Sequence, residues 1–414
     1  MGIIAVNDII EGMILSEDVK DISSRFLFPK GEILRPEYKR ILKIWGVCEI
    51  CIEGDYGREE NPENVPDLEF IEKVRENTKF VFKYVDLENP AIKEIFRLSV
   101  LYRSQNNILL SNERGNTNKC KDAEFQIRTD IKSKIEREKI TLPEIPSIVF
   151  KLNEIIAAPY TSATDIANIV NKSPSLVTVM LRIVNSAFYG FPTKIDNISR
   201  AVALIGSREI THLALGVSIM DLFRDIPRNI IDMHSFLKHS LACGIISRIL
   251  ASQKNIDNTE HFFVSGLLHD IGRLILFKYF PDQIKIAMNN ARESGVSLNS
   301  IEKDLLGCRH TDIAKYLLKK WKLPFSLENN IVFHHSPSSA HYPGNATIVH
   351  LADIIANGLG LGSSGGDIFV PYLDENSWKQ INISPGIFEP VVKQLFHQLP
   401  VMEPFFTCIK PEEK

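Results

Sequence analysis

The stretch GLLHDIG at residues 266–272 places a histidine beside an aspartate in an otherwise apolar run, with a glycine at each end. An unpaired imidazole or carboxylate is costly to bury, so His269 and Asp270 need partners if this run lies in a core. Imidazole and carboxylate groups together suit iron, manganese, zinc or nickel. The pair therefore suggests a metal centre, provided that the rest of the chain supplies further ligands.

Other histidines and one more aspartate lie on the apolar side of a predicted helix or at its end. The full candidate set comprises five histidines and two aspartates: His239, His269, Asp270, His310, His334, His335 and Asp353. One such residue is most simply a hydrogen-bonded core residue, but seven directed at one bundle centre favour a shared mononuclear or dinuclear metal site. Arg273, four residues after His269, either faces a phosphate or is paired with an acid.

The elements that must position these residues are helices. From residue 142 onward, apolar residues recur at helical spacing nearly throughout, and Ser162 with Asp165 forms a plausible capping pair at one helix start. The run from Phe262 to Phe280 is apolar all round, so we expect a single central helix that contains His269 and Asp270. The pattern predicts a mostly α fold built as a multi-helix bundle.

The chain divides into four predicted segments. Residues 1–55 form a small α/β domain, with extended runs at 13–19, 25–34 and 47–52 and a helix at 36–46. Residues 56–140 form a connecting region with helical patches at 68–77 and 89–103, then a charged stretch at 112–140 expected to be a linker or connecting helix. Residues 141–360 form the helical domain, and residues 361–414 a C-terminal extension that packs on the bundle.

Composition limits the classes of partner. The 414 residues predict two or three domains, and the net charge of −3 gives no overall attraction to nucleic acid or anionic membranes. The N-terminus has no basic segment, and no apolar run of about 18 residues occurs, so a cytoplasmic protein without membrane contact is expected. The six scattered cysteines fit reduced thiols. Cys48 and Cys51 form a CxxC in a strand-like run, where packing is favoured over a zinc or redox role.

A helix-turn-helix is the alternative interpretation of residues 165–184. A recognition helix presents polar and basic side chains to DNA, but the second helix here is apolar, and Arg182 is its only basic residue. We therefore expect this helix to lie in the core and expect no direct binding of nucleic acid.

Several motifs together resemble a known family. LPEIPSIVFKL, VNKSPSLVTVMLRIVNSAFYG, ISRAVALIGSREI, GLLHDIGRL and HHSP, in this order, are similar to the HDOD domain, a helical domain of the HD superfamily found in bacterial signalling proteins. The resemblance covers roughly residues 140–360. The opening unit, with EGMILSEDV, is similar to the small domain that precedes some HD-GYP phosphodiesterases.

The resemblance implies metal ligands at specific positions. The HD hydrolase pattern corresponds to His239, His269, Asp270 and Asp353, and the HD-GYP enzymes, which cleave cyclic di-GMP, add three histidines that match His310, His334 and His335. The substrate segment departs from that pattern. HHSPSSAHYPGN keeps Tyr342 and Pro343 but has His341 in place of the glycine, Ser235 stands where those enzymes have a glutamate, and Arg273 where they have a lysine.

Two functions follow from the resemblance. HDOD proteins are generally regarded as regulatory, which implies a signalling module that binds partner proteins or a small effector, with or without a bound metal. The resemblance leaves the oligomeric state open. The alternative is a metal-dependent phosphohydrolase that acts on nucleotides such as cyclic di-GMP. In that case Arg273 would stabilise charge on the phosphoryl oxygens.

Overall fold

A computed structural model describes residues 2–6, 9–20, 26–35, 37–39, 42, 47, 49–54, 68–109, 130–137, 142–157, 162–186, 189, 191, 193–365 and 369–407. Its N-terminal strands are β1 (Gly2–Ala5), β2 (Val19–Lys20), β3 (Phe26–Phe28) and β4 (Glu49–Ile52). The helices are α2 (Leu68–Val81), α3 (Pro90–Gln105), α4 (Ile131–Glu136), α5 (Ser147–Ala157), α6 (Ala163–Val170), α7 (Pro174–Val184), α8 (Ile198–Ile205), α9 (Ser207–Asp221), α10 (Met233–Gln253), α11 (Thr259–Leu268), α12 (Ile271–Tyr279), α13 (Pro281–Ser294), α14 (Leu298–Leu306), α15 (His310–Lys320), α16 (Phe325–Val332), α17 (Pro343–Leu359), α18 (Glu375–Ile381) and α19 (Phe388–Thr407), with short 3₁₀ turns η3 (Pro337–Ser339) and η4 (Pro385–Ile387).

The N-terminal unit has an apolar core of its own. Strand β1 pairs antiparallel with β4, and β2 pairs with β3. Buried side chains such as Ile4, Leu15, Leu34 and Ile52 form a cluster separate from the core of the helices. Most of the helix predicted at 36–46 lies outside the described residues, and strand β1 was not among the predicted extended runs. Cys48, half of the CxxC, lies outside the described residues, as do residues 110–129 of the charged stretch.

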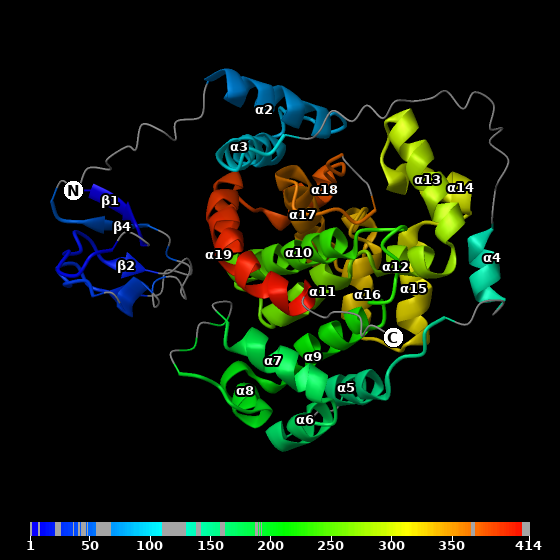
Figure 1. Cartoon of the computed structure of the whole chain (residues 1–414), viewed down its shortest axis with the longest axis horizontal. Helices are drawn as coiled ribbons and strands as arrows, with labels where there is room; N and C mark the ends of the chain where they lie inside the picture. Colours follow the sequence, from blue (N-terminus) through cyan, green and yellow to red (C-terminus); the bar gives the residue numbers. More distant parts are fainter. Residues whose placement is uncertain are drawn as a thin grey trace.

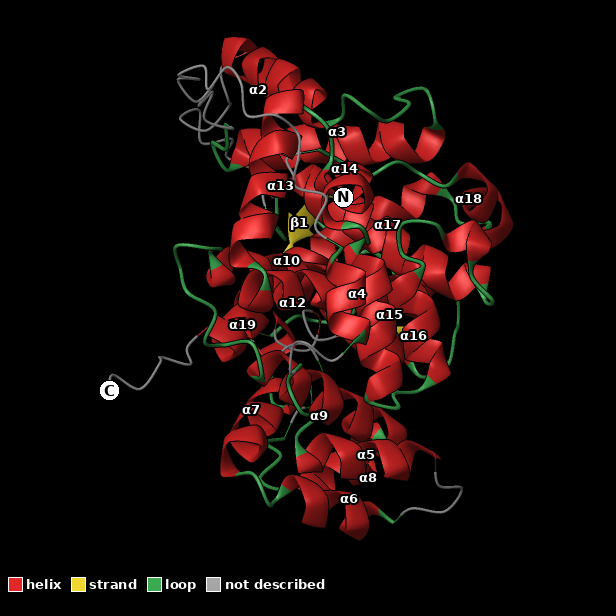
Figure 2. Ribbon diagram, turned by 90° about the vertical axis from the view of Figure 1, so that its right-hand side faces the viewer, coloured by secondary structure: helices red, strands yellow, loops and turns green. Residues whose placement is uncertain are grey.

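The helices form one bundle with a continuous core, which confirms the predicted mostly α architecture. Both views place α5 to α9 at one end of the bundle and α2 with α3 at the other, with α10 to α12 and α15 to α17 between them (Figures 1 and 2). Helix α10 packs against α11, α17 and α19, and α15 packs against α12 and α16. Ser162 and Asp165 form the predicted capping box at the start of α6. On α7, Leu176, Met180 and Ile183 are buried, as core packing requires.

The region that contains His269 and Asp270 differs from the expected single helix. Helix α11 ends at Leu268 and α12 begins at Ile271, so the pair lies at a break between two helices. His269 keeps helical dihedral angles, whereas Asp270 leaves the helical region with φ −99° and ψ 19°. Both helices are buried on every side, and hydrophobic periodicity therefore cannot reveal the break between them.

The two glycines of GLLHDIG allow neighbouring helices to approach closely. A Cβ atom on Gly266 would lie 2.5 Å from the carbonyl oxygen of Cys243 on α10, and a Cβ atom on Gly272 would lie 1.9 Å from the carbonyl oxygen of His310 on α15. Only a residue without a side chain fits at either contact. The break between α11 and α12 is thus held directly against the two helices that carry His239 and His310.

Helices α2 and α3 form a hairpin that docks on the bundle. Apolar side chains from Val81 to Leu98 belong to the same core as the later helices. The buried guanidinium of Arg103 donates through Nε and Nη2 to the carbonyl oxygen of Gly358, at 3.3 and 3.0 Å, near the C-terminal end of α17. Val370 also donates its backbone N–H to Val81 at 2.9 Å. No helix within the described residues combines the length and the apolar character needed to cross a membrane.

Candidate metal centre

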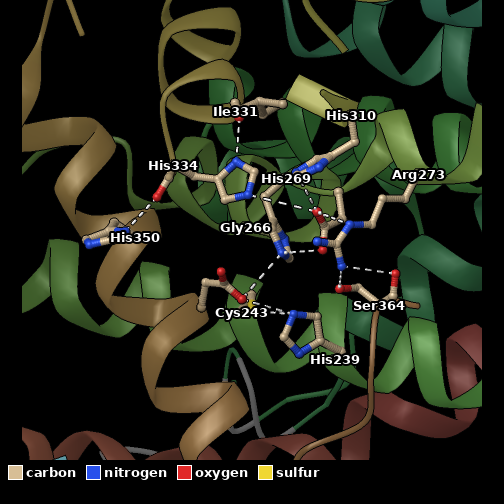
Figure 3. Close-up of polar contacts among 12 residues, drawn as sticks. His239, Cys243, Gly266, His269, Arg273, His310, Ile331, His334, His350 and Ser364 are labelled. Carbon is tan, nitrogen blue, oxygen red and sulfur yellow. Dashed lines mark hydrogen bonds and ion pairs between the residues drawn. The ribbon is translucent and has the colours of Figure 1, made fainter. Parts of the chain in front are cut away.

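The seven candidate ligands converge at the middle of the bundle, together with one cysteine. They form two groups of four, with the ligand atoms of each group within 4.8 Å of one another. The first group is His239, Cys243, His269 and Asp353, and the second is Asp270, His310, His334 and His335. Figure 3 shows the labelled members directed at a common centre from α10, the α11–α12 break, α15 and the end of α16.

The first group surrounds one oxygen of Asp353. Its Oδ1 lies 3.2 Å from Nε2 of His239 and 3.8 Å from Nε2 of His269. The Sγ of Cys243 lies 3.6 Å from the same nitrogen of His239. All four residues are buried.

The second group surrounds Asp270, whose two oxygens face different groups. Its Oδ1 lies 3.1 Å from Nε2 of His310 and 3.9 Å from Nε2 of His334, while Oδ2 lies 3.1 Å from Nε2 of His269 in the first group. A carboxylate placed in this way can bridge two metal ions. Asp270 thus lies between the two groups, each of which has ligand atoms that could hold a metal ion.

Several ring nitrogens at the centre make no hydrogen bond among the described residues. The Nε2 atoms of His269, His310, His334 and His335 are buried and lack a hydrogen-bond partner, even where a carboxylate oxygen lies within 4 Å. Buried polar atoms are almost always hydrogen-bonded. Four such atoms directed at one place fit ligands of a metal better than they fit a hydrogen-bonded core.

The other nitrogen of three of these rings is fixed by a partner outside the centre. Nδ1 of His269 lies 2.7 Å from the carbonyl oxygen of Gly266, and Nδ1 of His334 lies 2.7 Å from that of Ile331. Nδ1 of His310 lies 2.6 Å from Oε2 of Glu302. A carbonyl or carboxylate oxygen can only accept, so each Nδ1 carries a proton, and each Nε2 faces the centre as the atom that would bind a metal.

Burial and neighbouring charges shift the pKa values of these residues in different directions. Burial lowers the pKa of His334 to about 3, with a further contribution from His269. Burial also acts to lower the pKa of His310, but the carboxylates of Glu302 and Asp270 outweigh it and raise that pKa to about 9. For Asp353, burial is outweighed by His239 and His269, which lower its pKa to about 2. The aspartate is thus held in the ionised form that ligates a metal.

Arg273 is paired with acids of the site, one of the two roles expected from the sequence. Its Nε lies 3.5 Å from Oδ1 of Asp270 and 3.6 Å from Oε1 of Glu302, and its Nη1 donates to Oγ of Ser364 at 2.7 Å. The side chain is 1% exposed. The guanidinium therefore compensates two buried carboxylates and orients Asp270.

A small cavity reaches the centre from one side. Its volume is about 60 Å³, and Asp270, Arg273, His335 and Asp353 form its inner wall. At about 10–15 Å³ of such volume per water, it holds a few water molecules or one phosphate-sized group. The outer wall includes Tyr84, from the turn after α2, and the aromatic residues Phe369 and Tyr372. The rings of Tyr84 and Phe369 lie 4.9 Å apart edge to face.

The segment that corresponds to Gly-Tyr-Pro lies away from this cavity. Tyr342 is 49% exposed, and its backbone exchanges hydrogen bonds with the side chain of Asn329. His341 and Tyr342 pack against Phe325 at the surface. Pro343 begins α17, so the segment acts here as the N-terminal turn of the helix that carries Asp353.

The structure adds residues that the sequence analysis did not propose as part of the site. Cys243 shares the apolar face of His239, and its four-residue spacing was the signal for it. Glu302 is fully buried eight residues before His310, and a lone acid in an amphipathic helix gave no signal. The buried ring of His350 supports His334, because its Nδ1 lies 2.6 Å from that residue's carbonyl oxygen and its Nε2 accepts from the backbone N–H of Asp374 at 3.0 Å.

Residues 142–337 match the family model of the HDOD domain, so the chain contains an HDOD domain over this range. Asp353 lies beyond the matched residues. No comparison bears on the resemblance of the first 55 residues to the domain preceding HD-GYP enzymes, which stays a prediction.

Crystal structures with a similar fold include the following two. An HDOD domain protein of unknown function from Geobacter sulfurreducens has a TM-score of 0.55 at 20% identity, covering 68% of this chain and 100% of that chain. A protein from Shewanella amazonensis, provisionally assigned as a phosphohydrolase, has a TM-score of 0.52 at 21% identity, covering 67% of this chain and 98% of that one. An uncharacterized protein of Treponema pallidum is 24% identical over 197 residues, 47% of this chain; the match spans 38% of that relative's length.

The residues present fit a transition-metal pair. Imidazole, carboxylate and one sulfur are ligands for iron, manganese, zinc or nickel, and each binds a metal in its deprotonated form. Metals bound there would supply Lewis-acid polarisation of a phosphoryl oxygen. The chain itself contributes the orientation of the ligands, through Glu302, Arg273 and the carbonyl groups behind His269 and His334, and the small cavity beside them.

Proposed function

We propose that this chain is a regulatory HDOD protein that binds partner proteins or a small effector. In this proposal, a pair of metal ions at the bundle centre stabilises the packing of its helices. The observation that carries the proposal is the contrast between a full ligand set and a cavity of only about 60 Å³ beside it. Pockets for drug-sized ligands span about 300–1,000 Å³. A cyclic dinucleotide does not fit such a cavity while α2 and α3 are docked.

The docking of α2 and α3 supports a regulatory role. Their turn contributes Tyr84 to the cavity wall, and Arg103 attaches α3 to the end of the helix that carries Asp353. A change in the position of this hairpin would therefore alter both access to the centre and the outer surface of the bundle. A partner or effector that prefers one position would shift the equilibrium by its difference in affinity.

The test combines metal analysis, an activity panel and isolation of partners. Protein purified without chelator and loaded with Mn²⁺ or Fe²⁺ is assayed against cyclic di-GMP and a small phosphomonoester, beside Asp270→Ala. We expect bound metal, no turnover of cyclic di-GMP, and a specific partner or small molecule retained by the full chain from a host lysate. Robust metal-dependent turnover without any specific partner would overturn the regulatory proposal.

A second candidate function is favoured by the cavity wall. Both aspartates and Arg273 face a space large enough for a phosphate-sized group. This arrangement supports hydrolysis of a small phosphomonoester, in which Arg273 would stabilise charge on the phosphoryl oxygens. Turnover of the small phosphoester alone, lost in Asp270→Ala, would establish this candidate.

A further inference from the structure

Cys243 distinguishes the two groups of the centre. The first group contains its sulfur, whereas the second contains three imidazoles and a carboxylate. Sulfur is a soft ligand that selects zinc, iron or cobalt over manganese and magnesium, while carboxylate suits the harder ions. We propose that Cys243 binds metal as a thiolate, so that the two positions differ in the metal they prefer. This inference rests on the metal centre of the proposed function.

The position of Cys243 follows from α10. It lies one helical turn after His239, and the two side chains therefore share one face of the helix. The close approach of α10 and α11 at Gly266 brings this face against the α11–α12 break, because the carbonyl group of Cys243 itself is the closest contact of Gly266. Both Cys243 and His239 are fully buried, so neither side chain has solvent as an alternative partner.

The distances agree with a tetrahedral metal position. With typical bonds of about 2.3 Å to sulfur and about 2.0 Å to nitrogen, sulfur and nitrogen ligands at a tetrahedral angle lie about 3.5 Å apart. Sγ of Cys243 and Nε2 of His239 are 3.6 Å apart. The expected separation of adjacent nitrogen and oxygen ligands is about 3.3 Å. Nε2 of His239 and Oδ1 of Asp353 are 3.2 Å apart, and the corresponding distance for His269 is 3.8 Å.

A second observation points to a ligand at this place. Nε2 of His269 is buried without a hydrogen-bond partner, and its Nδ1 is fixed by Gly266 so that the lone pair faces Cys243 and Asp353. If the thiol only filled space, this nitrogen would have only the carboxylates of Asp270 and Asp353 as neighbours, at 3.1 and 3.8 Å. A metal shared by the sulfur, both imidazoles and the carboxylate satisfies all four groups.

Cobalt titration of the full chain tests the proposal. Metal-free protein is titrated with Co²⁺ alone, and bound cobalt is measured by elemental analysis while the near-ultraviolet region is scanned for a sulfur-to-cobalt charge-transfer band. The variant Cys243→Ser is compared with Cys308→Ser, a second buried cysteine whose sulfur lies 4.0 Å from the carbonyl oxygen of Leu306. Circular dichroism verifies that each variant is folded.

We expect two cobalt ions per chain and an intense charge-transfer band in wild type and in Cys308→Ser. In Cys243→Ser the band should vanish. The affinity of the first group for cobalt should fall at least about tenfold, and the affinity of the second group should be unchanged. If Cys243→Ser does not fold, X-ray absorption on wild type replaces it, with a sulfur scatterer expected at about 2.3 Å from cobalt. Cobalt bound without a sulfur band or scatterer, or a band that persists in Cys243→Ser, would overturn the role of Cys243. A chain that binds no cobalt would overturn the metal centre itself.

Discussion

Replacement of Gly272 by alanine should separate the assembly of the metal centre from the folding of the bundle. Gly272 follows Asp270 by two residues, in the first turn of α12, where this helix touches α15. An added Cβ would lie 1.9 Å from the carbonyl oxygen and 2.7 Å from the carbonyl carbon of His310. Both obstructing atoms are backbone atoms, so a side-chain rotation cannot relieve the overlap.

The size of the effect follows from these distances. Real Cβ atoms essentially never approach closer than 3.0 Å, so α12 and α15 must move apart by about 1.1 Å at least. Metal sites tolerate deviations of only about 0.2 Å in ligand distance. The free energy of unfolding should change little. Overpacking costs about 1–3 kcal/mol, but alanine regains about 1 kcal/mol over glycine in a helix. The second metal should therefore be lost from a protein that is still folded.

Equilibrium dialysis with elemental analysis, together with thermal unfolding in chelator, measures both quantities. Gly344→Ala is the matched control, because Gly344 lies in the first turn of α17 and a Cβ there meets nothing within 4 Å. We expect two metals per chain in wild type and in the control, and at most one in Gly272→Ala. If Gly272→Ala binds two metals with wild-type affinity, the metal centre does not depend on the close approach of α12 and α15, and the reasoning is refuted.

Three further predictions concern residues around the centre. Glu302→Gln should weaken metal affinity about 10-fold to 100-fold, because His310 loses the carboxylate behind it; competition with a chelator measures this, and unchanged affinity would contradict the orienting role. Arg103→Met should lower the free energy of unfolding by about 1–3 kcal/mol and expose the α2–α3 hairpin to limited proteolysis, since the bonds to the end of α17 are lost; a hairpin as resistant as in wild type would contradict it. Burial, with a contribution from His212, lowers the pKa of His261 to about 3. The unfolded chain therefore binds the proton first, and the contribution of His261 to stability should fall by about 1.4 kcal/mol per pH unit as pH drops from about 6.5 toward 3. The free energy of unfolding, measured with urea at several pH values in this range, should depend less steeply on pH in His261→Gln than in wild type. An identical dependence on pH would contradict the lowered pKa of His261.

The sequence predicted the helical bundle and the convergence of its histidines for a physical reason. A polar residue on an apolar helical face is costly to bury alone, so the positions of His239, His310 and Asp353 in the sequence already indicate a shared centre. The spacing of apolar residues also indicated α2 and α3, although the first was expected to end at residue 77 and extends to Val81.

Other features depend on tertiary contacts and left no periodic signal. The break at His269 and Asp270 is hidden because α11 and α12 are apolar on all sides. Glu302 and Ser364 become part of the site only through the packing of α14 and of the segment after α17 against Arg273. The roles of Gly266 and Gly272 likewise appear only when the neighbouring backbones are in place.

The most direct test of the metal centre is anomalous diffraction from crystals of protein purified without chelator, recorded on both sides of the absorption edge of the metal that elemental analysis identifies. We expect two anomalous peaks per chain: one within bonding distance of His239, Cys243, His269 and Asp353, the other within bonding distance of Asp270, His310, His334 and His335. Well-ordered side chains at these positions without an anomalous peak, in protein that also fails to take up added metal, would contradict it.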